Sequence, residues 1–144
     1  MIEQPYPYYD LGLDKHYFFL SVGEKGSVYK IVALTLKDNG NWNLGFGDLI
    51  DNKINDSIMT NNQDVRKVIG TVAKVAIDFL KQNPDKIVEI EPVGEKRKTL
   101  YNTVFRRYFT EIDTLYVIMG LINDKKEPYL PTKIYDKFTI KLKS

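Results

Sequence analysis

The sequence predicts an α+β fold in which a twisted, mainly antiparallel sheet packs against two helices in the order ββββ-α-β-α-ββ. Residues 61–84 carry apolar side chains at steps of three and four, as an amphipathic helix does. Residues 16–47 contain short apolar and aromatic runs separated by glycine turns, as a β-meander does. The chain has 144 residues, of which 43% are hydrophobic, so residues 1–144 are expected to form a single domain with its own core.

Residues 1–15 are expected to form an extended leader rich in tyrosine and proline. The two prolines disfavour a helix. The rings of Tyr6, Tyr8 and Tyr9 either dock the leader on the core or stack on nucleic-acid bases. We favour docking, because a ring that lies on the core buries a large apolar area.

Three antiparallel strands are expected next, at residues 16–21, 28–36 and 42–47. Glycines between the first two and an Asn-Gly pair before the third are typical hairpin turn signals. A short fourth strand is expected at residues 55–59, after a segment rich in aspartate and asparagine. That segment lacks the spacing of a calcium-binding loop, so it is interpreted as a turn.

The helix over residues 61–84 has clear expected ends. Asn61 or Asn62 is the expected N-cap, and Asp64 lies in the expected first turn, where the positive end of the helix dipole favours a carboxylate. Asn83 before Pro84 ends the helix.

A strand at residues 86–92 and a second helix from Thr99 to about Ile112 follow. Lys98, Asn102 and Arg106 are expected to form an outward row on this helix. Its apolar face is expected to contain Leu100, Tyr101, Val104, Phe105, Tyr108, Phe109 and Ile112.

Two further strands are expected at residues 115–122 and 137–142, separated by a charged loop at residues 123–128 and a proline-containing bend. Lys137, Lys141 and Lys143 on or beside the last strand would protect a sheet edge against pairing with another chain.

Composition excludes several functional classes. The chain has no cysteine and one histidine, so disulfides, thiolate metal sites and most imidazole chemistry are excluded, and no metal, cofactor or catalytic residue is expected. Glu89 and Glu91 are expected to project as neighbours from the same face of their strand, so one of them would have a raised pKa if it were buried. No apolar run reaches the roughly 20 residues that span a bilayer, and no signal peptide is recognisable, so we expect a cytoplasmic protein without a membrane partner.

The net charge of +2 is modest, but basic residues concentrate between positions 94 and 107. A strand-to-helix turn there would aim backbone N–H groups and a helix N-terminus at one anion. The same residues could instead contact the phosphates of single-stranded nucleic acid, or remain a solvated surface. The candidate phosphate-binding or nucleic-acid-binding residues are Lys96, Arg97, Lys98, Arg106 and Arg107.

Several short strings occur together in a recognisable order. They are YFF at 17–19, GxxG at 23–26, NLGFGD at 43–48, NNQD at 61–64, VIGTV at 68–72, Phe79 with Pro84, and RKTLY at 97–101. Together they resemble an uncharacterised bacterial family, found largely in Bacteroidota and known only as a domain of unknown function. The resemblance covers nearly the whole chain and implies no activity. The family's Gly-Ser/Thr pair and threonine are replaced here by Pro92-Val93 and Lys98, which argues against a hydroxyl-bearing phosphate loop.

Two of these strings suggest a pocket. If the two helix N-termini lie near each other, Asn62, Asp64, Arg97 and Tyr101 would converge, and Asp64 would lie within ion-pair reach of Arg97.

The function that these observations favour is a non-enzymatic interaction or regulatory module. Ten tyrosines and seven phenylalanines exceed what a compact core of this size readily buries, and tyrosine is enriched at interfaces. A protein partner or a homodimer is therefore expected. The alternative is a weak binder of single-stranded nucleic acid or a phosphate ligand through the basic strand-to-helix turn.

Overall fold

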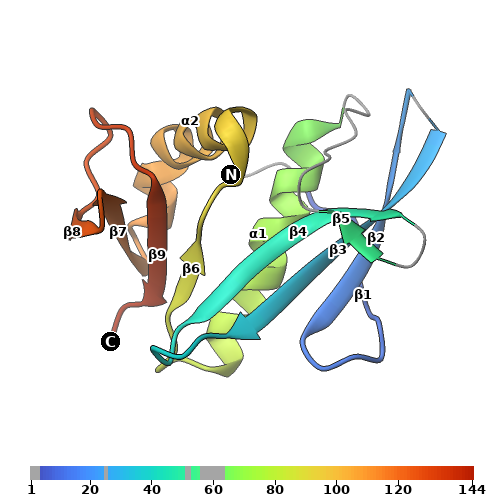
Figure 1. The fold of residues 1–144 in the computed structure, drawn as a ribbon, viewed down its shortest axis with the longest axis horizontal. Coiled ribbons are helices and arrows are strands. Elements are labelled where there is room, and N and C mark those ends of the chain that lie inside the picture. The colour runs from blue at the N-terminus through green and yellow to red at the C-terminus, as the bar shows by residue number, and fades with distance from the viewer. Residues whose placement is uncertain (1–3, 25, 51–52, 56–63) are drawn as a thin grey trace. The chain divides into compact units, whose positions relative to one another are not determined.

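The computed structural model describes residues 4–24, 26–50, 53–55 and 64–144 (Figure 1). Its strands are bonded in the order β1-β2-β3-β4-β6-β9-β7-β8, with β5 on β4; β4 and β6 run parallel and the pairing is otherwise mainly antiparallel. The predicted α+β fold class is confirmed. The elements are β1 (Tyr9–Asp10), β2 (His16–Gly23), β3 (Gly26–Leu36), β4 (Trp42–Ile50), β5 (Lys53–Asn55), α1 (Val65–Gln82), β6 (Val88–Ile90), α2 (Gly94–Ile112), β7 (Tyr116–Ile122), β8 (Lys125–Pro128) and β9 (Lys137–Leu142).

The described residues group into two compact units. The N-terminal unit contains residues 4–35 and 44–79, and the C-terminal unit contains residues 36–43 and 80–144. Each unit has its own packed residues and its own network of polar contacts, so each is described by itself.

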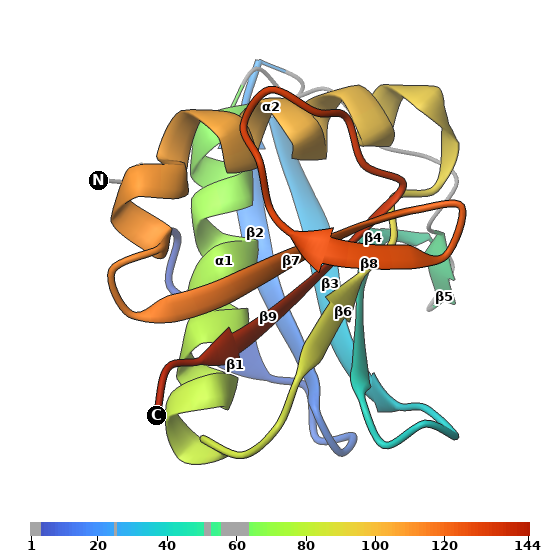
Figure 2. The ribbon, with the colours of Figure 1, turned by 90° about the vertical axis from the view of Figure 1, so that its left-hand side faces the viewer.

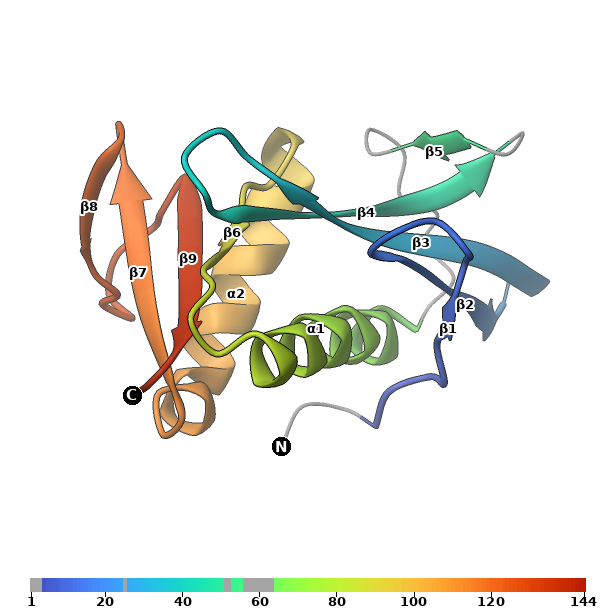
Figure 3. The same cartoon turned by 90° about the horizontal axis from the view of Figure 1, so that it is seen from below.

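In the N-terminal unit, α1 lies along one face of β2, β3 and β4 (Figure 3). The apolar stripe of α1 predicted from its period of three and four residues is buried there. Strand residues from both faces of the sheet, such as Phe19 and Ile31, are buried as well. The buried apolar residues of this unit include Phe19, Ile31, Val32, Leu34, Phe46, Val68, Ile69, Val72, Val75, Ala76 and Phe79.

The leader docks on this unit, as predicted, but pairs with β2 over only two residues. Tyr9 stands opposite Phe18 and Asp10 opposite Tyr17. If this register continued, Pro7 would stand opposite Leu20 and Pro5 opposite Val22. A proline has no N–H to donate to the hydrogen-bond ladder between two strands. The strand therefore ends where the prolines begin.

In the C-terminal unit, α2 lies beside β7 and β9 (Figure 2). Phe105 of α2 stacks on Phe138 of β9, with ring centroids 4.2 Å apart. A Cβ atom on Gly120 of β7 would lie 2.3 Å from the ring of Tyr135, which is fully buried. Only glycine at position 120 leaves room for this ring.

The helix boundaries differ from the prediction. α1 begins at Val65, so Asp64 precedes the helix and does not lie in its first turn, while residues 61 and 62 lie outside the described residues. α2 begins at Gly94, five residues before the predicted Thr99. Lys96 to Lys98 therefore belong to the helix and not to a turn before it.

The strand pattern contains β8, which the sequence did not predict, in addition to the two-residue β1 of the leader. The predicted charged loop at residues 123–128 is a β-hairpin turn followed by β8. Asn123 and Asp124 both have positive φ, 51° and 63°, which is the backbone of a tight hairpin turn. The predicted fourth strand overlaps β5 at Asn55, and its remaining residues lie outside the described residues.

Candidate functional site

The five basic residues singled out in the sequence are divided by the structure. Lys96, Arg106 and Arg107 are exposed on the side of α2 that faces solvent. Arg97 is only 5% exposed. The fifth residue, Lys98, is half-buried and forms an ion pair within the protein. Sequence reasoning therefore identified five candidates of which three are available at the surface.

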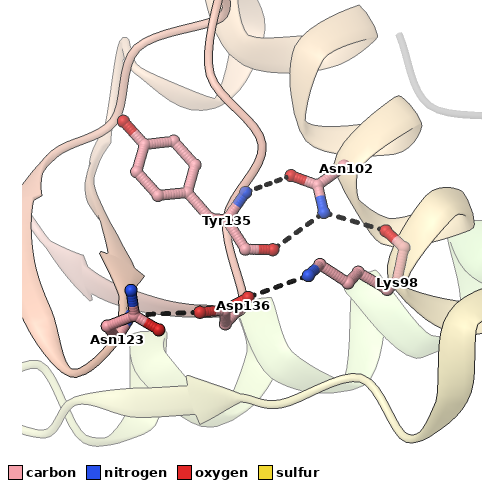
Figure 4. Close-up of polar contacts among 5 residues, drawn as sticks. All are labelled: Lys98, Asn102, Asn123, Tyr135 and Asp136. Atoms are coloured by element: carbon pink, nitrogen blue, oxygen red, sulfur yellow. Dashed lines mark hydrogen bonds and ion pairs between the residues drawn. The ribbon is translucent and has the colours of Figure 1, made fainter.

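Lys98 contributes to a polar network that anchors the segment before β9 (Figure 4). Its ammonium group donates to Oδ1 of Asp136 over 2.8 Å, and Oδ2 of Asp136 accepts the backbone N–H of Asn123 over 3.0 Å. The hydrogen bond from Lys98 lowers the pKa of Asp136, and the same bond raises the pKa of Lys98. Lys98 therefore stabilises the local fold through its ion pair with Asp136.

Asn102 forms the second half of this network, and its predicted outward position is wrong. Its side chain is 3% exposed. The amide Nδ2 donates to the carbonyl of Tyr135 and Oδ1 accepts the N–H of Tyr135, each over 2.9 Å. Nδ2 also donates to the carbonyl of Lys98 over 2.9 Å. Asn102 thus pairs with the backbone of Tyr135 much as a neighbouring strand would.

The residues of the predicted pocket fall in different parts of the molecule. Asp64 belongs to the N-terminal unit, Arg97 and Tyr101 belong to the C-terminal unit, and Asn62 lies outside the described residues. Their convergence stays a prediction. What the structure gives for Asp64 is a set of partners in its own unit.

Asp64 is the anchor of the leader. Its Oδ2 accepts hydrogen bonds from the Tyr6 hydroxyl and from the Ser21 hydroxyl, each over 2.5 Å. The Tyr6 oxygen also accepts the backbone N–H of Val22 over 3.0 Å. Burial, followed by the hydrogen bond to Asp64, raises the pKa of Tyr6. Asp64 therefore has a structural role in holding the leader.

A second phenol repeats this arrangement further along α1. The Tyr8 hydroxyl donates to Oδ2 of Asp78 over 2.5 Å, and Lys74 donates to Oδ1 of Asp78 over 2.9 Å. Burial and the bond to Asp78 raise the pKa of Tyr8 above its usual range. Two tyrosines of the leader are therefore docked by hydroxyl groups as well as rings.

A buried ion pair joins Lys30 of β3 to Asp48 of β4, and each residue is only 1% exposed. Lys30 stands opposite Phe19 and shares the core-facing side of the sheet with it. Sequence reasoning missed this pair. The available signal was a lysine at a core-facing position of an otherwise apolar strand, because such a charge is retained only with a partner.

Glu89, which was considered as an acid with a raised pKa, has the opposite shift. Burial alone would raise its pKa, but hydrogen bonds from Asn39 and Lys37 dominate and lower it to about 2. The donors lie 3.0 Å and 3.1 Å from its oxygens, and the Lys137 ammonium group lies at 3.5 Å. Glu91 is exposed. Glu89 is therefore ionised, and its carboxylate holds Asn39, Lys37 and Lys137 together in the C-terminal unit.

An exposed apolar surface remains on the N-terminal unit, which we call the outer aromatic face: Tyr9, Phe18, Val22 and Tyr29. The rings of Tyr9 and Phe18 lie 5.6 Å apart and those of Phe18 and Tyr29 6.2 Å apart. Tyr9, Val22 and Tyr29 are 55%, 56% and 51% exposed. Strand alternation places this face opposite Phe19, on the side of the sheet away from α1. Sequence reasoning missed it because it expected all leader rings to dock.

Two acidic residues lie near the ends of the strand that carries Phe18 and Val22. Asp14 and Glu24 are exposed just beyond the two ends of β2. An open hollow of about 430 Å³ lies where the leader turns into β2. It is lined by Asp10, Gly12, Leu13, Asp14, Lys15 and Tyr17.

Within the described residues, no group of three or more histidine, aspartate and glutamate side chains is arranged to hold a metal ion. In the same part of the chain, neither helix has the length and apolar character needed to cross a membrane.

Residues 3–143 match the sequence model of the family of unknown function DUF6934, so the chain belongs to that family. No curated protein and no solved structure matches the chain.

Proposed function

We propose that this member of a family of unknown function is a non-enzymatic interaction or regulatory module that binds a protein partner through the outer aromatic face. The observation that carries the proposal is the exposure of three large apolar side chains, Tyr9, Val22 and Tyr29, around Phe18 on one sheet face. Aromatic side chains in a contiguous exposed patch are typical of protein interfaces.

The acidic groups of both units support a non-enzymatic role. Asp64 and Asp78 each accept a phenolic hydrogen bond, and Asp48 is paired with Lys30. Glu89 has a low pKa and is therefore already ionised, which is the wrong state for a general acid near neutral pH. These carboxylates are used to hold segments of the chain together.

A binding assay with matched variants tests the proposal. The immobilised chain and its Tyr9→Ser/Tyr29→Ser variant are exposed to extract of the source cells, and bound proteins are identified and their affinities measured. We expect the double variant to weaken binding by about tenfold or more, because a central aromatic residue often contributes over 1.4 kcal/mol. Leu36→Ser/Leu115→Ser is the control, since both leucines are 59% exposed but lie in the C-terminal unit.

The proposal is wrong if the wild-type chain is monomeric at every concentration and retains no protein partner. It is also wrong if a partner is retained equally by the Tyr9→Ser/Tyr29→Ser variant.

A second candidate function is binding of single-stranded nucleic acid or another phosphate ligand along α2. Lys96, Arg106 and Arg107 favour it, because all three are exposed and none of them forms an ion pair with a described residue. Lys96 and Arg107 are eleven residues apart, or about 16 Å along the helix axis on the same side. Contacts of this kind bind phosphates and weaken with added salt.

Titration of a labelled single-stranded oligonucleotide at low and moderate salt tests this alternative. Binding that falls with salt and is lost in Arg106→Ala/Arg107→Ala supports it. Binding that is absent at low salt, or unchanged by the double substitution, contradicts it. Lys125→Ala/Lys126→Ala removes the same charge from exposed positions of β8 and serves as the control.

A further inference from the structure

The two units carry opposite charge. Counted over the sequence of residues 2–35 and 44–79, the N-terminal unit contains seven basic and nine acidic residues, a formal net charge of −2, and residues 36–43 and 80–144 of the C-terminal unit contain fourteen basic and ten acidic residues, a net charge of +4. A chain with one acidic and one basic unit is electrostatically complementary to a second copy of itself.

The two surfaces also match in chemistry. The outer aromatic face presents the exposed rings of Tyr9 and Tyr29, and the exposed acids Asp14 and Glu24 lie just beyond the two ends of β2, with Asp14 3.6 Å from the ammonium group of Lys15. The solvent-facing side of α2 presents Arg106 and Arg107, with exposed threonines around them. A guanidinium group stacks on a tyrosine ring and forms bidentate hydrogen bonds with a carboxylate, so arginine suits both parts of the outer aromatic face.

We propose that the outer aromatic face of one copy binds the solvent-facing side of α2 of a second copy, with Arg106 and Arg107 over the exposed tyrosine rings. This inference rests on the proposed function, and names the partner as the chain itself. In this interface the basic residues of α2 contact the exposed aromatic residues. The sequence alone showed no connection between these two features.

The strand edges favour contact through this face over pairing of strands. β1 is two residues long and follows two prolines, and β8 carries Lys125, Lys126 and Pro128. Short strands, lysines and prolines at a sheet edge disfavour addition of a strand from another chain. Self-association is therefore expected to be sensitive to salt and to side-chain charge.

Sedimentation of the full chain over a range of concentrations, at low and high salt, tests the proposal with two charge-reversal variants. Variant A carries Arg106→Glu/Arg107→Glu and variant B carries Asp14→Lys/Glu24→Lys. We expect the wild type to self-associate at low salt, and each variant alone to do so at least about tenfold more weakly, because like charges then face each other. A mixture of A and B restores association, since A retains the acidic aromatic face and B retains the basic helix.

Lys125→Glu/Lys126→Glu is the matched control, because it changes the net charge as much as variant A at exposed positions of the same unit. It is expected to associate with an affinity close to that of the wild type. Tyr29→Ser is expected to weaken association without changing the net charge.

A wild-type chain that is monomeric at low salt overturns the proposal, as do variants that associate like the wild type or a mixture that does not recover. If the chain is monomeric but a different protein is still captured in a Tyr29-dependent manner, this inference fails and the proposed function stands. Association through α2 that Tyr29→Ser does not weaken contradicts both.

Discussion

The two units anchor their irregular segments with different chemistry. In the N-terminal unit, phenols of the leader donate to Asp64 and Asp78. In the C-terminal unit, Asn102 pairs with a peptide backbone and Glu89 collects amide and ammonium donors. The phenols lose their protons only at alkaline pH, Glu89 gains one only at acid pH, and Asn102 does not titrate. The N-terminal phenols should therefore contribute a loss of stability at alkaline pH. The C-terminal unit should lose stability at acid pH through Glu89 and also at alkaline pH, because burial raises the pKa of Tyr129 and Tyr135.

The largest effect is expected for Asn102→Ala. It leaves the N–H and carbonyl of Tyr135, a fully buried residue, without their side-chain partner. Because each buried unsatisfied group costs about 1–3 kcal/mol, the free energy of unfolding should fall by about 3 kcal/mol, equally at all pH values. Denaturant titration at several pH values measures this. Thr103→Ala, on the exposed side of the same helix, should change it by less than about 0.5 kcal/mol.

Glu89→Gln tests how much of the stability lost at acid pH depends on this carboxylate. Because the pKa of Glu89 is lowered from 4.5 to about 2, its contribution is present above pH 4.5 and is lost as the pH falls toward 2. The shift corresponds to about 3 kcal/mol, and we expect about 2 kcal/mol because partly exposed Lys37 is screened by solvent. The variant should be less stable at neutral pH and should lose less stability on acidification. If the variant lost as much stability on acidification as the wild type, Glu89 would not be the group responsible for that loss.

Tyr8→Phe should have the smallest effect on the free energy of unfolding and should act on the loss of stability at alkaline pH. The raised pKa of Tyr8 means that its contribution is full below its ordinary value of 10.0 and is lost as the pH rises above it. A hydrogen bond to a carboxylate at a half-buried site contributes about 1 kcal/mol. The variant should therefore be about 1 kcal/mol less stable at neutral pH and less sensitive to alkali. Tyr9→Phe, which changes an exposed ring, should leave the loss of stability at alkaline pH unchanged.

Features with a strong repeating pattern could be predicted from the sequence. The helix α1, the meander of β2 to β4 and the strands β7 and β9 follow from residue period and turn residues, which act locally. The start of α2 was predicted too late because Val93 precedes the helix without a side-chain cap, so no capping residue marks its first turn. β8 was missed because its lysines and proline have low strand propensity, and its pairing is imposed by the turn at Asn123 and Asp124.

The candidate sites depended on non-local contacts and were harder to predict. Lys98 and Arg106 are eight residues apart on one helix, yet one is paired with Asp136 and the other is exposed. Asn102 was assigned to solvent by helical period alone, whereas the backbone of Tyr135, 33 residues later, brings it into the interior. A helical wheel shows which side chains share a face, but not which segment will cover it.

The two prolines of the leader also affect how the protein behaves at high concentration. A tyrosine-rich extended segment beside β2 would otherwise be a good template for cross-β growth, because aromatic residues favour strands and an unprotected edge accepts further copies. Pro5 and Pro7 stop the ladder after two residues, and the Tyr6 oxygen accepts the backbone N–H of Val22. The leader thus combines the affinity of tyrosine for a sheet with a built-in barrier to fibril formation.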